Sequence, residues 1–249
     1  MDPEGRVALI TGGASRVGGA ITLGLAGAGA DVVIHYRSSS GPAEAVATQA
    51  RGLGVEALTL QADLGDKAGS DALAEAVAAS VGAVDILVHA ASPYISTPLE
   101  SMTLQTWRLV IGVVAESFLW LTQRLGPQMK LQGDGSIITI LDLGAFQPWP
   151  RYLAHGAGKS ALWALTRSLA VELAPEVRVN SVVPGPVLPP PGFTEQQIAL
   201  GAQNTLLGRW GTPHDVVAAV LFLVRSQYIT GEALFVDGGE RWAHRRKVG

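Results

Sequence analysis

Seven short apolar runs alternate with longer amphipathic segments along the whole chain. The runs contain mainly Val, Ile and Leu with few polar interruptions, which is typical of parallel strands buried on both faces. The segments between them have the apolar spacing of helices, and we expect these near 17–28, 42–52, 67–80, 101–130, 150–173 and 213–225. The expected strands are Val7–Ile10, Asp31–Tyr36, Val55–Leu60, Val84–His89, Ser136–Leu141, Arg178–Val182 and Ala233–Val236.

This alternation favours right-handed strand–helix–strand units and an α/β doubly wound sheet of parallel strands with helices on both faces. At 249 residues, the chain suits one such domain (1–249) better than two small ones. Residues 184–192 interrupt the alternation with five prolines, so we expect a loop there. A short helical piece, Thr194–Ala202, follows. Residues 184–205 lie after the sixth strand, where ligands bind in such sheets, and form either a substrate loop or a plain surface connection.

Composition and charge narrow the function classes. Hydrophobic residues make up 48% of the chain, which is enough for a sizeable core. The net charge of −3 gives no general attraction to nucleic acid or to an anionic membrane. The absence of cysteine excludes disulfides and thiolate catalysis, and no cluster has metal-ligand spacing. The longest apolar run has nine residues, Val216–Val224, and Met1 leads almost directly into the first strand, so we expect a soluble cytoplasmic protein.

A glycine-rich turn follows the first predicted strand, in the order Thr11-Gly12-Gly13-Ala14-Ser15-Arg16-Val17-Gly18. A buried strand that leads through small residues into a helix N-terminus is a phosphate-binding arrangement, because free N–H groups and the helix dipole favour an anion there. Gly12 permits the tight turn, and Gly18 permits close packing of the helix. The turn predicts a dinucleotide whose diphosphate is contacted by Gly12, Ser15, Arg16, Val17 and Gly18.

Residues after the second strand indicate which dinucleotide binds. In this fold an acid at that place binds a ribose 2′-hydroxyl, whereas a basic residue accommodates a 2′-phosphate. The chain has no acid there and has Tyr36-Arg37-Ser38, so we expect NADPH rather than NADH. The alternative for Arg37 is an ordinary exposed cation. Asp63, followed by Leu64 after the third strand, either contacts the adenine edge or caps the next helix.

Five motifs in one order resemble the short-chain dehydrogenase/reductase family over essentially the whole chain. They are Thr11-Gly12-x3-Arg16-x-Gly18, Asp63-Leu64, Lys159 on a long helix, Asn180-Ser181-Val182-Val183-Pro184-Gly185 and Ile229-Thr230-Gly231-x4-Val236-Asp237-Gly238-Gly239. The resemblance implies a single Rossmann-type domain, assembly as a homotetramer, and an oxidoreductase activity with NAD(P). It also implies further cofactor contacts at Ala90, Ala91, Pro184, Gly185 and Val187.

Within that family the details are most similar to pteridine reductases. These also have Arg at the position of Arg16, a His-Tyr pair followed by Arg and Ser, as in His35-Tyr36-Arg37-Ser38, and a segment like Ala91-Ser92-Pro93-Tyr94-Ile95-Ser96-Thr97-Pro98-Leu99. The resemblance implies that Tyr94 stacks a flat substrate against the nicotinamide and that Ser92 hydrogen-bonds to substrate or cofactor. The alternative for Tyr94 is a loop aromatic packed on the sheet edge.

The catalytic positions depart from the family pattern. The family places a proton-donating Tyr four residues before the Lys that binds the nicotinamide ribose, and here Lys159 is preceded at that spacing by His155. Asp142 replaces the usual Ser, as in pteridine reductases, and Val114 replaces an Asn. The usual Asn-Asn after the fourth strand is His89-Ala90, and His89 is expected to hydrogen-bond within the core. Tyr152 lies roughly 10 Å along the helix from Lys159, so it does not replace the missing Tyr.

Two interpretations of the catalytic positions remain open. Either His155 or Asp142 supplies the proton for a reduction, or the site has lost or changed its activity. We expect an NADPH-dependent reductase of a small carbonyl or imine substrate, a pterin being the best single candidate. The alternatives are a 3-oxoacyl or ketone reductase, and a cofactor-binding protein with little or no turnover.

Overall fold

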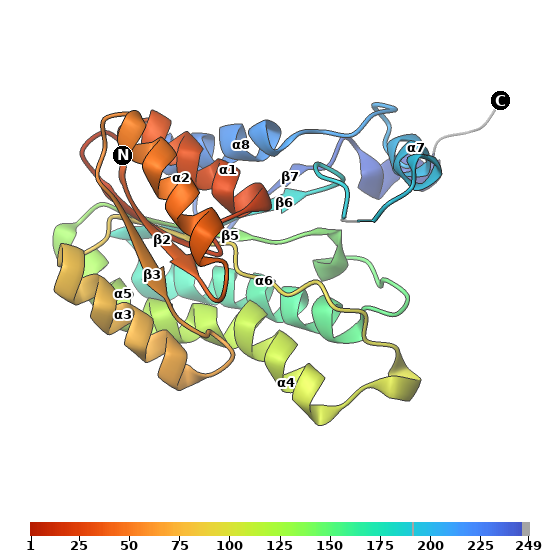
Figure 1. Cartoon of the computed structure of the whole chain (residues 1–249), viewed down its shortest axis with the longest axis horizontal. Coiled ribbons are helices and arrows are strands. Elements are labelled where there is room, and N and C mark those ends of the chain that lie inside the picture. The colour runs from red at the N-terminus through yellow and green to blue at the C-terminus, as the bar shows by residue number, and fades with distance from the viewer. Residues whose placement is uncertain (191, 246–249) are drawn as a thin grey trace.

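The computed structural model, which describes residues 1–190 and 192–245, is built around a seven-stranded parallel sheet in the order β3-β2-β1-β4-β5-β6-β7 (Figure 1). The expected doubly wound sheet is confirmed. Each expected strand is present, and its ends differ from the expected ones by no more than two residues. The strands are β1 Val7–Thr11, β2 Asp31–Tyr36, β3 Ala57–Gln61, β4 Ile86–His89, β5 Gly135–Ile140, β6 Val177–Pro184 and β7 Ala233–Val236.

Helices cover both faces of this sheet (Figure 1). One layer contains α1 (Arg16–Gly27), α2 (Ser40–Gly52) and α8 (Pro213–Arg225), and the other contains α3 (Lys67–Val81), α4 (Leu104–Ile111), α5 (Ser117–Gln132) and α6 (Leu153–Leu173). Alternate strand residues enter the two cores: Ile10 and Ile34 face the first layer, and Leu9 and Val33 face the second. The expected short helix is α7 (Glu195–Gln203), which lies away from the sheet (Figure 1).

The single helix expected over 101–130 is interrupted. A short turn at Leu99–Ser101 precedes α4, and a π-helical segment, Gly112–Glu116, joins α4 to α5. Gly112 lies so close to the backbone of Gly65 that a Cβ there would overlap the Gly65 carbonyl, and His89 Nε2 lies 3.3 Å from the Val114 carbonyl oxygen. The stretch Leu104–Gln132 is long and apolar enough to cross a membrane, but 61% of its most apolar window is buried, as in a core helix.

Pro184 corrects the expected boundary of the proline loop. It is the last residue of β6 and pairs with Val236, although a proline was expected only in the loop. The Ser181 N–H donates to the carbonyl of Glu232, just before β7, and the Gly185 N–H donates to the carbonyl of Val236 in β7. The nitrogen of Pro184 therefore faces the opposite edge. The ladder to β5 ends before that point, at Ile140 and Val182. The missing N–H of Pro184 therefore removes no sheet hydrogen bond.

Candidate active site

The glycine turn is packed tightly against the loop after β4. Gly12 has a φ of 66°, and a Cβ there would lie 3.1 Å from the Cα of Ala91. A Cβ on Gly18 would overlap the carbonyl oxygen of Gly12, so the first turn of α1 lies directly on the glycine turn. Ser15 precedes α1 with an extended backbone and makes no capping hydrogen bond with its side chain. These features suit close approach of an anion to backbone N–H groups.

His35 holds the turn from the side of β2. Its Nδ1 accepts the N–H of Gly12 at 3.1 Å, and its Nε2 lies 3.1 Å from the carbonyl oxygen of Ala62. Since Nδ1 is an acceptor, the proton of the neutral ring is on Nε2 and is donated to Ala62. Burial lowers the pKa of His35 to about 4, although the Ala62 carbonyl and the charge of Asp63 act in the other direction. The ring is therefore neutral at physiological pH.

His89 holds the other side of the turn through Thr11. The hydroxyl of Thr11 accepts the N–H groups of Ala90 and Ala91, both at 3.1 Å, and lies 3.1 Å from His89 Nδ1. The bonding is complete if the Thr11 hydroxyl donates to Nδ1 and His89 Nε2–H donates to the Val114 carbonyl. Burial first and the positive charge of Lys159 second lower the pKa of His89 to about 3. This neutral histidine ties together three segments at the carboxyl edge of the sheet.

Asp142 and His155 form a close pair in which the carboxylate faces outward. His155 Nε2 lies 2.7 Å from Asp142 Oδ2, and the Gly144 N–H donates to Asp142 Oδ1 at 2.9 Å. The side chain of Asp142 is 22% exposed and that of His155 only 2%. Burial raises the pKa of Asp142, but the hydrogen bond from His155 and the charge of Lys159 outweigh it and hold this pKa below its usual range. Asp142 is therefore an anion in front of His155.

Lys159 lies deeper in the protein. Its Nζ donates to the carbonyl oxygen of Ile140 at 2.8 Å, and the residue is 4% exposed. Burial lowers the pKa of Lys159, and the charge of Asp142 partly offsets this. Lys159, His155 and Asp142, predicted as a group, are brought together behind the carboxyl edge of the sheet.

A cavity of about 620 Å³ connects the glycine turn to Asp142. Arg16 reaches across it, because its guanidinium donates to the carbonyls of Leu188 and Pro189 at 3.2 and 3.3 Å. Eight residues predicted for the site line this cavity, namely Arg16, Val17, Ser92, Tyr94, Asp142, Pro184, Gly185 and Val187. Of the other predicted residues, Gly12, Gly18, Ala90 and Ala91 are packed together at the glycine turn, and His155 lies against Asp142. Among the described residues, no group of His, Asp or Glu side chains is arranged to hold a metal ion.

Comparison with known proteins identifies the family. Residues 12–240 match a family described as enoyl-(acyl carrier protein) reductase. The chain belongs to the short-chain dehydrogenase/reductase family. A 3-oxoacyl-[acyl-carrier-protein] reductase of Synechocystis is 32% identical over 94% of this chain and 96% of its own length. A 3beta-hydroxysteroid dehydrogenase of Eggerthella lenta is 30% identical over 96% of this chain and 94% of its own length.

A solved relative agrees with this assignment. The L-sorbose reductase of Gluconobacter frateurii, crystallised with NADPH and L-sorbose, has a TM-score of 0.90 and 29% identity, covering 96% of this chain and 98% of its own. This short-chain dehydrogenase/reductase is thus an NAD(P)-dependent oxidoreductase that acts on carbonyl substrates. The comparisons do not show a closer relation to pteridine reductases than to other branches of the family.

The short-chain dehydrogenase/reductase places its predicted nucleotide residues at the end of β2 and β3. Arg37 and Ser38 are exposed, and the Arg37 guanidinium has no partner within residues 1–190 and 192–245. Leu64 is buried, and Tyr36 is partly buried. The alternative role of Asp63 as the cap of the next helix is wrong. Asp66 caps α3 by accepting the Gly69 N–H, whereas Asp63 accepts the N–H of Gly65 in a local turn.

Tyr94 projects from the loop after β4. This loop is joined to the start of α6, because the Thr97 hydroxyl accepts the N–H of Ala154. Tyr94 as a whole residue is 53% exposed. Its ring stacks on the ring of Tyr152 with centroids 4.5 Å apart and meets the ring of His155 edge-on at a centroid distance of 5.4 Å. One face of Tyr94 is covered and the residue lines the cavity. Burial, a hydrogen bond to Tyr152 and the charge of Asp142 raise the pKa of Tyr94, so its hydroxyl is a weak acid.

Three cavity residues outside the predicted loop 184–205 were missed by the sequence analysis: Trp149, Trp210 and Glu240. Trp149 stacks almost parallel to His155, with centroids 5.9 Å apart. Glu240 begins the short helical segment after β7. Burial and the nearby charge of Asp237 raise the pKa of Glu240 to about 7. No family motif singles these residues out, and no periodic spacing in the sequence marks them.

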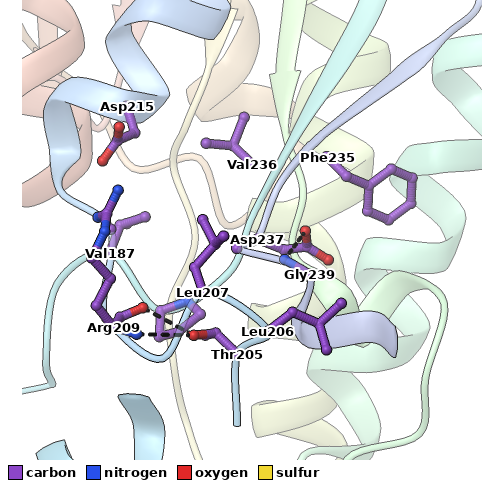
Figure 2. A pocket seen from close by; sticks show the side chains of 13 residues that line it. Val187, Thr205, Leu206, Leu207, Arg209, Asp215, Phe235, Val236, Asp237 and Gly239 are labelled. Carbon is purple, nitrogen blue, oxygen red and sulfur yellow. Dashed lines mark hydrogen bonds between the residues drawn. The ribbon is translucent and has the colours of Figure 1, made fainter. Parts of the chain in front are cut away.

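A smaller cavity of about 370 Å³ lies beside the first one, between the start of α8 and the end of β7 (Figure 2). Val187 contributes to both cavities. Thr205 anchors the opposite wall by hydrogen bonds with the backbone of Arg209, which Figure 2 shows as dashed lines. This cavity contains none of the predicted catalytic residues, so we assign the site to the larger one.

Proposed function

We propose that this enzyme is an NADPH-dependent reductase of a small carbonyl or imine compound. The observation that carries the proposal is one cavity that is lined both by Arg16 and Val17 of the glycine turn and by Asp142 and Tyr94. The residues fit the cofactor: Gly12 leaves room for close approach, and Arg37 is exposed without a partner in the described chain. When bound, NADPH supplies the hydride.

The chain's own residues divide the remaining tasks. Gly12, Ser15, Arg16, Val17 and Gly18 would hold the diphosphate, and Arg37 with Ser38 the 2′-phosphate. Lys159 would bind the nicotinamide ribose after leaving the Ile140 carbonyl. Asp142 and His155 together would hold the proton that a carbonyl reduction consumes, and Tyr94 would stack a flat substrate, with Ser92 hydrogen-bonding to it. A pterin-like heteroaromatic is the first compound to test for this reason.

A ketone or 3-oxoacyl compound is the second candidate substrate. The similarity to the 3-oxoacyl-[acyl-carrier-protein] reductase of Synechocystis favours it, and the apolar residues Val187, Leu188 and Phe193 of the cavity could contact an acyl chain. We further propose a cytoplasmic homotetramer. Sedimentation measurements would test the oligomeric state.

Replacing Arg37 with Asp is expected to reverse the choice of coenzyme. The substitution removes a guanidinium that would pair with the 2′-phosphate and supplies a carboxylate that would accept the ribose 2′-hydroxyl. We expect NADPH affinity to fall by about 10- to 100-fold and NADH affinity to rise, as measured by calorimetry. Arg108→Asp, an exposed change of the same charge on α4, is the control. Equal affinities of the wild type for both coenzymes would contradict the proposal.

Replacing Asp142 with Asn is expected to lower kcat/KM by about 100-fold or more while leaving NADPH affinity nearly unchanged. The substitution keeps the size of the side chain but removes the charge that lies against His155. NADPH oxidation would be followed with dihydrobiopterin and with simple ketones. A wild type that binds NADPH and reduces none of a broad set of carbonyl and imine compounds would instead indicate a cofactor-binding protein without turnover.

A further inference from the structure

The charged and aromatic groups of the large cavity are unevenly distributed. Its one lining cation in the described chain, Arg16, belongs to the glycine turn and donates to the Leu188 and Pro189 carbonyls. The two lining acids, Asp142 and Glu240, follow strands β5 and β7, whereas the glycine turn follows β1. Tyr94, Trp149, Phe193 and Trp210 supply aromatic rings to the same cavity.

The proton that Asp142 and His155 share, which a carbonyl reduction would consume, is not exposed to this cavity. His155 and Lys159 are buried and are absent from its described lining. Both oxygens of Asp142 already accept hydrogen bonds, and its carboxyl is held in the ionised form. The Tyr94 hydroxyl is a weaker acid than an ordinary phenol. His155 stands at the position of the usual tyrosine, but Asp142 lies in front of it, so the cavity is lined by an anion there.

A substrate that is already a cation suits this arrangement. Reduction of a neutral C=O bond adds one hydride and one proton, and the proton must come from a donor at the oxygen. Reduction of a C=N bond whose nitrogen carries the positive charge adds only the hydride: the C=N π pair becomes the nitrogen lone pair, and a neutral amine results. Carboxylates and aromatic faces are the groups that bind organic cations.

We propose that the cavity is selective for a small organic cation that bears the reducible bond, with Asp142 and Glu240 as its counter-charges and Glu240 as a specificity-determining residue. This inference rests on the proposed function and names its substrate class. The charge lies either on the nitrogen of the reducible C=N bond or on an ammonium group beside a C=O bond; in the second case the ammonium group gives its proton to the oxygen and becomes a neutral amine. Binding is strongest to the ionised form of Glu240.

The groups around Glu240 agree with that role. The carboxyl of Asp237 lies at the end of β7 and accepts the N–H groups of Gly239 and Arg241, and its charge opposes ionisation of Glu240. The guanidinium of Arg241 lies 3.7 Å over the ring of Phe235. The carboxyl of Glu240 has no hydrogen-bonding or ion-pair partner within the described part of the chain, which leaves it available to a ligand.

The test compares matched compounds and variants. The cation 1,2-dimethyl-1-pyrrolinium has no N–H proton to lose and stays charged near neutral pH, and 2-methylcyclopentanone is its neutral counterpart. Aminoacetone and butanone form the second pair. In at least one of the two pairs, we expect kcat/KM for the cation to be at least about ten-fold higher than for the neutral compound. Glu240→Gln should lower kcat/KM for the cation about ten-fold more than kcat/KM for its neutral counterpart. Glu232→Gln, an equal charge change on an exposed residue outside this cavity, is the control.

Two further readouts separate the possible roles of Glu240. As a counter-charge, it should make kcat/KM for the permanent cation rise with pH through about 7, and this rise should vanish in Glu240→Gln. As a proton donor, it would make kcat/KM for the neutral ketone fall over the same range, and that result would overturn the inference. Calorimetry with the non-reducible cation 1,1-dimethylpyrrolidinium should show binding that weakens about ten-fold in Glu240→Gln.

The outcomes for the proposed function and for this inference are distinct. Failure of NADPH to bind, or of every compound to be reduced, contradicts the proposed function. Reduction of the neutral compounds at rates equal to those of the cations, with no effect of Glu240→Gln, leaves the reductase function standing and overturns the choice of a cation. Thermal unfolding of Glu240→Gln at the wild-type temperature would show that any loss is not a folding defect.

Discussion

Lowering the pH from 8 to 4.5 is expected to reduce the free energy of unfolding by about 5 kcal/mol through His35 and His89 alone. Both pKa values lie below the value of about 6.5 for an unfolded chain. The unfolded state therefore takes up protons first, and stability is lost as the pH falls from about 6.5 toward 4. Since small domains are stable by only about 5–15 kcal/mol, the protein should be close to unfolding at pH 4.5.

The hydrogen bonds explain why protonation is so unfavourable. A proton on His35 Nδ1 would face the N–H of Gly12, and a proton on His89 Nδ1 would face the Thr11 hydroxyl, whose oxygen already accepts two N–H groups. Both events disturb the glycine turn, so NADPH affinity should fall over the same range. Urea denaturation followed by circular dichroism at several pH values measures the effect.

A matched pair of variants isolates the contribution of His89. His89→Asn replaces the ring with an amide that has one donor and one acceptor, and it should remove about half of the pH dependence. His214→Asn, on the exposed start of α8, should leave it unchanged. An identical pH dependence in all three proteins would show that these buried rings do not control acid stability.

Gly18→Ala is expected to destabilise the fold by about 3 kcal/mol, at the upper end of overpacking effects, and to abolish measurable NADPH binding. The new methyl group would overlap the carbonyl oxygen of Gly12, which is backbone and cannot rotate away. Relief requires α1 to move off the turn, and the N–H groups at the helix start would move with it. Thermal unfolding and calorimetry with NADPH measure the two effects.

The neighbouring glycine provides the control for that substitution. A Cβ on Gly19 would meet its nearest atom, the carbonyl carbon of Ala14, at 3.6 Å, which is an ordinary contact. Gly19→Ala should therefore fold normally and bind NADPH, with a stability equal to or slightly above that of the wild type. Similar losses in both variants would mean that the first turn of α1 tolerates no side chain at either position, whatever the local space.

The repeating pattern predicted the sheet because burial on both faces forces apolar residues into every strand. The same pattern could not predict the π-helical segment at Gly112–Glu116. Its amphipathic spacing is compatible with one helix, and the interruption is associated with the nearby backbone of Gly65 and with His89, which are distant in sequence. Pro184 was placed in the loop because sequence does not reveal which edge of a strand has already lost its partner.

The candidate site shows a similar limit. Motif spacing placed Asp142, His155 and Lys159 together, since a strand end and one helix face determine their separation. Motif spacing left open which of Asp142 and His155 lines the cavity. The answer depends on the rings of Trp149 and Tyr94, which pack against the His155 ring. Glu240 escaped notice because its place in the cavity follows from the turn after β7, which no periodicity encodes.

Arg16 has a φ of 52°, a left-handed backbone conformation that a side chain with a Cβ rarely adopts. Yet it is this side chain that spans the cavity to Leu188 and Pro189. At residue 16, thermal stability therefore favours glycine, whereas the hydrogen bonds to the opposite loop require arginine. Laboratory evolution for thermostability alone should drift toward glycine at this position, and selection for turnover should restore the arginine.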